Sequence, residues 1–516
     1  MRETPLAPLF QSGVFASPSL WDGDPLKIIR RRLNGAVLFL VILLHGHLNG
    51  HRVFAADPMP LSLDGAIDLA LRNNLDAAIR AEETRGGEWD IRAEVAVFDP
   101  SFQAEATLKR SEDRLFTVEG SGDGVDFNRQ TDQNLRADLS QRLPAGGRYS
   151  IGLERTHFGP RFGSGGIFRA DLVFRLTQPL LRGFGREIVA LPQVAARTGH
   201  AMLEAEARID QARIVVAVTE AYWESVFARE HLAIQRQKRQ ATEALLAQNR
   251  VKVDLGLSAA IEVLVAEAAV ASREETVVVA EAAIADAEDR IRSLLNLPQT
   301  DIVAVDRLPD ILDDLVLEAG DADRIASALT RRPEIARQRL DLHRRSLVSQ
   351  QAHHDRQSAL DFTTALAAGG AGRGDGDALD RLGSADTTRW EAGVIWTYPI
   401  GHRAADARAQ KADSELKVAH LVRRTLERQV SDEVRQAARR VRTDRKRVET
   451  TRRARALAEQ KRAAGEERFR LGLIDSRVLL EIQDETAEAA DGALRAITDA
   501  QVSRVRLKHA EGTLFP

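Results

Sequence analysis

Two stretches of the chain alternate apolar and polar residues with a period of two, which is typical of β-strands. They cover residues 168–179 and 390–398. In both stretches every second residue is apolar or aromatic, so these residues share one face of the strand. They are Phe168, Ala170, Leu172, Phe174 and Leu176 in the first stretch, and Trp390, Ala392, Val394, Trp396 and Tyr398 in the second. Pro179 and Pro399 follow, and proline marks the exit from a sheet because it has no N–H for the ladder. The pattern predicts two strands, each leading into a long helix.

Similar alternation predicts earlier partner strands at residues 102–110 and 360–366. Each is separated from its later strand by a polar, glycine-rich segment, and the segment 369–377 is expected to be a loop. The first half of the chain has further alternating material at 134–157, turning at the "PAGG" of residues 144–147. We interpret it as an additional hairpin, which either joins the same sheet or stays outside it.

Long helices are predicted where glycine and proline are missing. Neither occurs in residues 200–255, 257–297, 402–464 or 473–491. A single helix over the first of these runs would be about 84 Å long. In the third run, apolar residues recur at spacings near 3.5: Val422, Leu426, Val430, Val434, Ala437, Val441 and Val448. Such a stripe indicates a helix that packs along a partner helix.

Two segments nearly repeat one another. "DLGLSAAIEVLVAE" covers residues 254–267, and "RLGLIDSRVLLEIQ" covers residues 470–483. The openings of the two halves, from Leu61 and from Asp321, also align. We therefore predict two structural repeats, each with a helix, strands around a polar loop, a very long helix, a Gly-Leu break and a returning helix. The expected boundaries are 1–55 for an N-terminal extension with a signal peptide, 56–310 for the first repeat and 311–516 for the second.

The N-terminus has the pattern of an export signal. Lys27 and three arginines precede the apolar run 36–44, and "VFA" at residues 53–55 suits cleavage before Ala56. About nine apolar residues are too few to span a bilayer. A short buried helix in a cytosolic protein is the alternative.

Composition narrows the function further. The chain has 516 residues, a net charge of -3 and no cysteine, which excludes disulfides, thiolate catalysis and cysteine-based metal sites. An arginine-rich run at 423–462 permits a nucleic-acid surface, but an acidic helix predicted at 258–291 gives a simpler account, in which the two helices lie side by side. His343, His353 and His354 lack the companions of a metal site. We expect no cofactor, no metal and no enzyme activity.

Strands with one apolar and one polar face, in an exported chain, suggest a membrane barrel with a wet interior. Lipid tolerates no open sheet edge, and four or six strands are too few to close a barrel. The strands must therefore come from several identical chains. The long helices, which have the pattern of soluble helices, would extend away from the membrane.

This arrangement resembles the TolC-like outer-membrane efflux and secretion channels. The residues that carry the resemblance are the two Gly-Leu segments, "QPLLRGFG" at 178–185, "YPIG" at 398–401 and "LSLDGAIDLALRNN" at 61–74. The resemblance implies a mainly α fold with a membrane β-barrel part, in which a trimeric barrel continues into a long α-helical periplasmic tunnel. It also implies a homotrimer in the outer membrane of a Gram-negative-type envelope. A periplasmic adaptor and an inner-membrane transporter would be its partners, and exit would be passive.

The resemblance also implies functional positions. Glu262 and Glu481 would be acidic residues around a periplasmic aperture, where a ring of carboxylates attracts cations; two ordinary exposed glutamates are the alternative. Other expected aperture positions are Phe469, Ile474, Asp475 and Arg477. Phe469 and Ile474 replace a tyrosine and an arginine of the family, and Val478 replaces an acid. We therefore expect closure by apolar packing, closure by Asp475 and Arg477, or a looser resting aperture. The expected adaptor contacts at the helix tips are Gly256, Leu257, Gly472 and Leu473. The expected strand-to-helix transitions are Pro179, Gly183, Pro399 and Gly401.

A periplasmic adaptor or coiled-coil scaffold is the competing function. Adaptors also carry long helical hairpins, but normally one hairpin with small β domains, whereas this sequence contains the helical unit twice and its strands have a face compatible with lipid.

Overall fold

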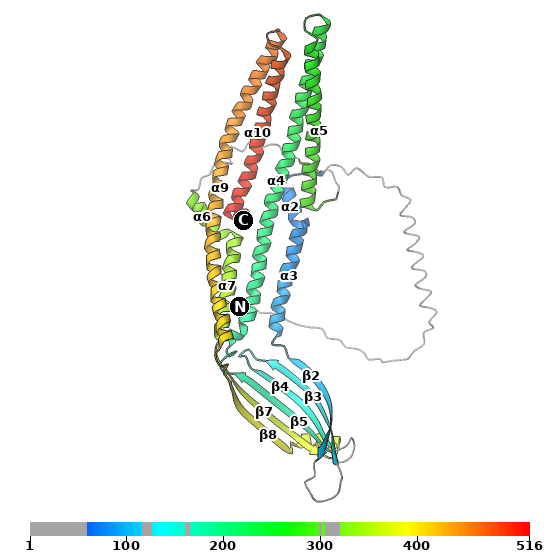
Figure 1. Ribbon diagram of the computed structural model, residues 1–516, viewed down its shortest axis with the longest axis vertical. Helices are drawn as coiled ribbons and strands as arrows, with labels where there is room; N and C mark the ends of the chain where they lie inside the picture. The colour runs from blue at the N-terminus through cyan, green and yellow to red at the C-terminus, as the bar shows by residue number, and fades with distance from the viewer. Residues whose placement is uncertain (1–58, 116–125, 160–165, 299–301, 305–319, 516) are drawn as a thin grey trace, which may run out of the picture. The chain divides into compact units, whose positions relative to one another are not determined.

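The alternating segments form one antiparallel sheet with strand order β2-β3-β4-β5-β7-β8 (Figure 1). The computed structural model describes residues 59–115, 126–159, 166–298, 302–304 and 320–515. The strands of this sheet are β2 (Ser101–Leu115), β3 (Asp126–Arg142), β4 (Arg148–Gly159), β5 (Ile167–Pro179), β7 (Ala359–Gly372) and β8 (Thr387–Thr397). The additional hairpin predicted at 134–157 is confirmed as β3 and β4, and it lies inside the sheet, between β2 and β5.

The register gives the sheet two chemically different faces. One row of directly opposed residues crosses all six strands on the apolar face: Phe102, Leu139, Ile151, Phe174, Leu366 and Trp390. A neighbouring row on the other face is mostly polar: Glu105, Arg136, Glu154, Asp171, Gly369 and Thr387. Side chains alternate between faces along every strand, so this register collects the apolar positions of all strands on one side. The strand pattern predicted from the sequence is thus confirmed.

The helices continue the strands. They are α2 (Leu63–Asn73), α3 (Leu75–Ala96), α4 (Arg186–Asp254), α5 (Ile261–Leu295), α6 (Asp321–Arg331), α7 (Pro333–His354), α8 (Asp375–Ser384), α9 (Arg403–Arg470) and α10 (Ser476–Glu511). Contacts place α3, α4, α7 and α9 side by side in that order. The hairpin partners α5 and α10 return along α4 and α9, and α10 also lies against α4. A small second sheet pairs β1 (Met59–Leu61) with β6 (Ile302–Ala304).

The long helices are confirmed, but they also include proline and glycine residues that lie outside the runs predicted from the sequence. Helix α4 continues through Pro192, and α9 and α10 contain Gly465 and Gly492. The opening of each half is two helices rather than one, because the chain turns at Asn74 and at Arg332, both of which have extended backbone. The side chain of Asn74 accepts hydrogen bonds from the first N–H groups of α3, which favours a new helix at that point.

The apolar stripe of α9 forms much of the helical core. Val430, Val434, Val441 and Val448 are at most 1% exposed and pack against α10, α6 and α7. Val422, at the start of the stripe, is instead 47% exposed. The partner helix predicted from the 3.5-residue spacing is therefore present over most of the stripe.

Two expectations about neighbouring segments are wrong. Residues 369–377 are not a loop, because β7 runs to Gly372 and α8 follows. A Cβ on Gly370 or Gly372 would lie 2.4 Å from a Cβ of α8, so only glycine allows this helix to pack on the strand. The acidic helix α5 lies along α4 rather than along the arginine-rich α9, since its short connection folds it back on the helix that precedes it.

The predicted signal peptide and its cleavage site lie outside the described residues, as does most of the link at 298–320. Residues 60–516 form one unit by their contacts. Within the described part of the chain, no helix combines the length and the apolar character needed to cross a membrane. The division into two repeats stays a prediction.

Candidate functional site at the helix tips

The Gly-Leu segments are the turns that reverse the two long hairpins. Gly256 and Gly472 have φ angles of 69° and 73°, in the left-handed region that favours glycine. The N–H of Leu257 donates to the carbonyl of Lys252 at 2.8 Å, and that of Leu473 donates to Arg468 at 2.9 Å. Both turns are thus Schellman-type helix ends, in which the bond that skips the glycine satisfies a terminal carbonyl.

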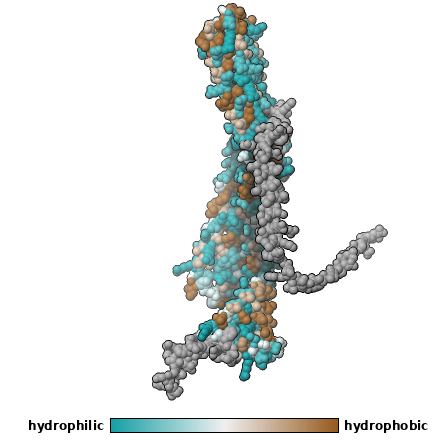
Figure 2. Space-filling view, turned by 90° about the vertical axis from the view of Figure 1, so that its right-hand side faces the viewer, coloured by the Kyte–Doolittle hydropathy of each residue, from teal (hydrophilic) through white to brown (hydrophobic). Residues whose placement is uncertain are grey.

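Leucines on either side of each glycine point into solvent. Leu255 and Leu257 are 67% and 75% exposed, and Leu471 and Leu473 are 62% and 64% exposed. Figure 2 shows hydrophobic surface among polar residues at the end of the molecule that carries the hairpin tips. Scattered exposed leucines need no explanation, but four at two adjacent turns form an apolar surface of the kind that marks a protein contact.

Polar side chains join the two tips to each other. The carboxylate of Glu262, in the first turn of α5, accepts a hydrogen bond from the backbone N–H of Ser476 at 3.3 Å. Asn249 on α4 donates through Nδ2 to the Ser476 hydroxyl at 2.8 Å and to the Glu262 carbonyl at 3.0 Å. Asn249 and Ser476 are both 1% exposed, so these bonds are sheltered from water. Glu262 therefore helps to hold the hairpins together, whatever else it does.

An apolar cluster lies behind this contact. Phe469 is 5% exposed and packs with Leu245, Leu479 and Leu480, with Ile474 at the edge of the cluster. The ammonium group of Lys252 lies 3.9 Å from the centre of the Phe469 ring, a cation–π contact between α4 and α9. Phe469 and Ile474 thus pack between the two hairpins of one chain. Their place at an aperture stays a prediction.

The other predicted aperture residues are open to solvent. Glu481 and Arg477 are exposed on α10. Asp475 is the N-cap of α10, and its carboxylate accepts a hydrogen bond from the N–H of Val478 at 2.9 Å. Asp475 therefore caps the N-terminus of α10, a role that its position just before a helix indicates. The roles of Glu481 and Arg477 at an aperture stay predictions.

Asn249 and Ser476 were not predicted from the sequence. One signal was present: Asn249 follows Leu245 by four residues and so falls on the same buried face of α4. A polar residue in an apolar stripe requires hydrogen-bond partners. A groove of about 800 Å³ lies beside these residues, lined by α4, α9 and α10, including Leu245, Lys252 and Phe469.

The predicted strand-to-helix transitions contain glycines with a positive φ, which glycine adopts without steric strain. Gly183, Gly185 and Gly401 have φ angles of 82°, 103° and 90°. Gly183 donates its N–H to Nε2 of His354 at 2.8 Å, which ties the exit of β5 to the end of α7. Pro179 is the last residue of β5, and Pro399 follows β8 by two residues, so both mark the ends of strands as expected.

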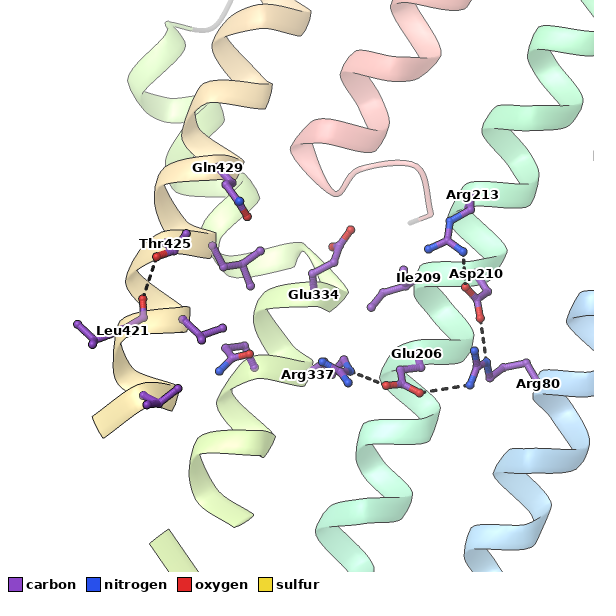
Figure 3. A pocket seen from close by; sticks show the side chains of 14 residues that line it. Arg80, Glu206, Ile209, Asp210, Arg213, Glu334, Arg337, Leu421, Thr425 and Gln429 are labelled. Carbon is purple, nitrogen blue, oxygen red and sulfur yellow. Dashed lines mark hydrogen bonds and ion pairs between the residues drawn. The ribbon is translucent and has the colours of Figure 1, made fainter. Parts of the chain in front are cut away.

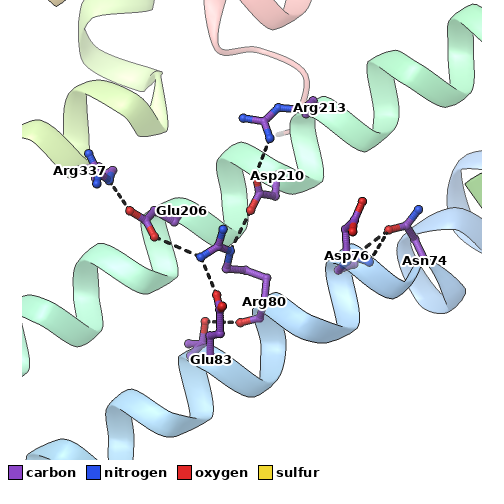
Figure 4. A network of polar contacts seen from close by, with 10 residues as sticks. Asn74, Asp76, Arg80, Glu83, Glu206, Asp210, Arg213 and Arg337 are labelled. Atoms are coloured by element: carbon purple, nitrogen blue, oxygen red, sulfur yellow. Dashed lines mark hydrogen bonds and ion pairs between the residues drawn. The ribbon is translucent and has the colours of Figure 1, made fainter.

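A network of ion pairs links three helices of the layer (Figures 3 and 4). Arg80 on α3 contacts Asp210 at 2.8 Å and Glu206 at 3.2 Å on α4, and Arg337 on α7 also binds Glu206. Arg213 adds a contact to Asp210 at 3.1 Å. The hydrogen bond to Asp210 is the main cause that raises the pKa of Arg80. Each carboxylate is shared by two arginines, so this array positions helices and offers no free base.

The network borders a groove of about 720 Å³ that runs between α4, α7 and α9. Its α9 side mixes apolar and polar residues: Val418 and Leu421 are 56% and 60% exposed, and Thr425 and Gln429 lie along the same helix (Figure 3). In the described residues no group of three or more histidine, aspartate or glutamate side chains is placed to hold a metal ion. His353 instead contacts the Asp413 carboxylate at 3.0 Å.

No protein-family model matches the chain, and no curated protein matches it in sequence. Solved structures do match it. The outer-membrane channel OprN has a TM-score of 0.66 and 17% identity, covering 87% of this chain and 89% of its own. The CmeC outer-membrane channel of Campylobacter jejuni has a TM-score of 0.62 and 16% identity, over 88% and 86%. The MtrE outer-membrane channel of Neisseria gonorrhoeae has a TM-score of 0.61 and 16% identity, over 88% and 89%.

The chain therefore has the fold of the TolC-like outer-membrane channels, with long helices joined to a sheet that corresponds to their β-barrel part. The resemblance inferred from the sequence is confirmed at the level of the fold.

Proposed function

We propose that the chain forms a homotrimeric channel-tunnel in the outer membrane, through which substrates leave passively after delivery by a periplasmic adaptor and an inner-membrane transporter. A tripartite efflux pump or a type I secretion system would supply this context. The observation that carries the proposal is the apolar row that crosses all six strands, because such a face has no place in water and suits lipid.

The sheet cannot stand alone in a membrane. Strands β2 and β8 are its two edges, and each has unpaired backbone groups along its outer side. Hydrocarbon offers no hydrogen bonds to such groups, so the edges must meet other chains. The edge β8 of one copy meeting the edge β2 of the next closes a ring by head-to-tail contacts.

The helical layer has matching edges. Its outer helices are α3, which enters β2, and α9, which leaves β8. Both carry exposed apolar side chains: Leu75 and Ile79 on α3, and Val418, Leu421 and Val422 on α9, the last three along the groove between α4, α7 and α9. A neighbouring copy whose β2 pairs with β8 also brings its α3 against α9. The same rotation between copies therefore covers the open edge of the sheet and the open edge of the helical layer.

The tips are the proposed adaptor site and aperture. Gly256, Leu257, Gly472 and Leu473 present small, apolar turns that partner helices can grip. Glu262, Glu481 and Arg477 lie near the same end and supply charge for an aperture that repeats three times around the axis. No reaction is catalysed, and no cofactor takes part.

The test is ion selectivity in planar bilayers. The double variant Glu262→Gln and Glu481→Gln removes two carboxylates per chain but leaves an oxygen on residue 262 that still accepts from Ser476. We expect a lower preference for cations, measured as a reversal potential across a salt gradient, because a ring of carboxylates attracts cations. Glu274→Gln is the matched control, an exposed α5 residue about 18 Å along the helix from Glu262.

An unchanged reversal potential in the double variant removes both residues from the aperture and leaves the channel in place. Protein that stays monomeric in mild detergent and never conducts refutes the channel itself. Release of the protein from envelope fractions by salt alone supports the adaptor or scaffold function instead, although the exposed apolar sheet face argues against it.

A further inference from the structure

The first half of the chain contributes four strands to the sheet and the second half contributes two. The surplus is the hairpin of β3 and β4, which lies between β2 and β5. Removing it from the sheet would break two complete ladders, β2 with β3 and β4 with β5. The hairpin is therefore in the wall of each copy, and its contacts show how it is held there.

Ion pairs on the polar face connect the hairpin to β5. Arg136 on β3 contacts Asp138 on the same strand and Glu154 on β4 at 3.4 Å. Arg175 on β5 contacts Glu154 at 2.7 Å and reaches Asp138 at 3.9 Å. Asp138 is only 7% exposed and lies directly over Gly152, whose Cβ, if present, would be 2.1 Å from its carboxylate. Glycine on β4 thus makes room for the carboxylate that the two arginines share.

The turn of the hairpin is attached to the strand-to-helix junction. The carbonyl of Ala145 accepts hydrogen bonds from the N–H of Gly185 at 3.2 Å and from Nε2 of Gln178 at 3.3 Å. On the other side, Gln141 donates to the carbonyl of Phe98, at the end of the α3 segment, at 2.9 Å. The hairpin is therefore fixed to both helices that flank it in sequence, α3 and α4.

We propose that each copy places all six strands in the membrane wall, so that the trimer closes as an eighteen-stranded barrel. This inference rests on the trimeric channel proposed above. Barrels of 16 to 18 strands leave an aqueous channel. The membrane end of the trimer is therefore an open, water-filled channel.

Cysteine labelling tests the position of the hairpin in the full-length trimer, because the natural chain has no cysteine. Ser140→Cys on β3 and Ser150→Cys on β4 face the polar side, whereas Leu139→Cys and Ile151→Cys face the apolar side. In liposomes, a membrane-impermeant maleimide added outside should label the serine positions, and labelling should be lost at the other two. Equal labelling on both faces would place the hairpin in water and overturn the inference.

A strand count separates this inference from the proposed function. Electron cryo-microscopy of the trimer should show eighteen strands. A trimeric channel with twelve strands overturns the inference alone, whereas the absence of a trimeric barrel overturns the proposed function as well.

Discussion

The tip turns allow a prediction about backbone strain. Gly472 has a φ of 73°, and a Cβ built on it meets no atom within 4 Å. Gly472→Ala therefore adds no clash, and its whole effect is the cost of about 1–2 kcal/mol that an L-residue incurs in the left-handed region. The turn that closes the α9–α10 hairpin should be destabilised by that amount.

Hydrogen exchange measures the effect locally. The amides of Gly472 and Leu473 donate to Phe469 at 3.1 Å and to Arg468 at 2.9 Å, so they exchange only when the turn opens. A loss of about 1–2 kcal/mol raises the open population about 5- to 30-fold. Mass spectrometry of the peptide that covers 466–474 should show exchange faster by this factor. Gly256→Ala, at a φ of 69°, should have the same effect at the other tip.

Gly492→Ala is the matched control. Gly492 lies inside α10, and its Cβ would likewise meet nothing within 4 Å. Alanine in a helix interior is more favourable than glycine by about 1 kcal/mol, so exchange around residue 492 should slow. The strain argument would be refuted if exchange at the tip were unchanged in Gly472→Ala. It would also be refuted if exchange at the tip became slower in both Gly472→Ala and Gly492→Ala.

Three other substitutions test single contacts. Burial raises the pKa of the Asp444 carboxyl, although the positive charge of Arg440 acts to lower it. The folded chain therefore binds this proton more tightly than the unfolded chain does. As a result, stability falls as the pH rises above about 3.9, the pKa of an unfolded aspartate. Asp444→Asn should therefore raise the Tm at pH 7 and change it little at pH 4, by scanning calorimetry; an equal shift at both pH values would contradict this. Gly152→Ala should displace Asp138 and lower the temperature at which the trimer dissociates on gels, whereas Gly393→Ala, with 3.5 Å to its nearest neighbour, should not. Tyr222→Phe leaves the buried carbonyl of Leu61 without the 3.2 Å bond from the hydroxyl, which should cost about 1–3 kcal/mol in denaturant unfolding.

The sheet and the tip turns could be predicted from sequence because both depend on local rules. Alternation with a period of two assigns each strand residue to a face, whatever its neighbours are. Gly472 between two leucines after a long helix matches a helix end that needs a left-handed residue. These two rules were enough to indicate the strands and the hairpin tips, whereas the resemblance to outer-membrane channels depended on motifs that occur in both halves of the chain.

What the sequence left open depends on contacts between distant residues. The sequence left Glu262 as either an aperture acid or an ordinary exposed glutamate, and only the folded chain brings it to Ser476, 214 residues away. The wrong pairing of α5 with α9 has a similar origin. Opposite charge is not specific, and α5 finds arginine partners on α4 instead, such as Arg229 for Glu288 and Arg236 for Glu281. Helix α8 was not predicted because the glycines that allow it to pack on β7 are equally typical of loops.

The position of Glu262 connects selectivity with cohesion of the tips. Its carboxylate accepts from Ser476 on the opposite hairpin, beside the apolar cluster around Phe469. Any opening that separates the hairpins of one chain must break this bond and the bond from Asn249 to the Ser476 hydroxyl, and must expose part of the cluster. A change to alanine removes charge and contact together, whereas glutamine removes the charge alone. A channel that opens more readily with alanine but loses cation preference with either residue would show that one side chain serves both purposes.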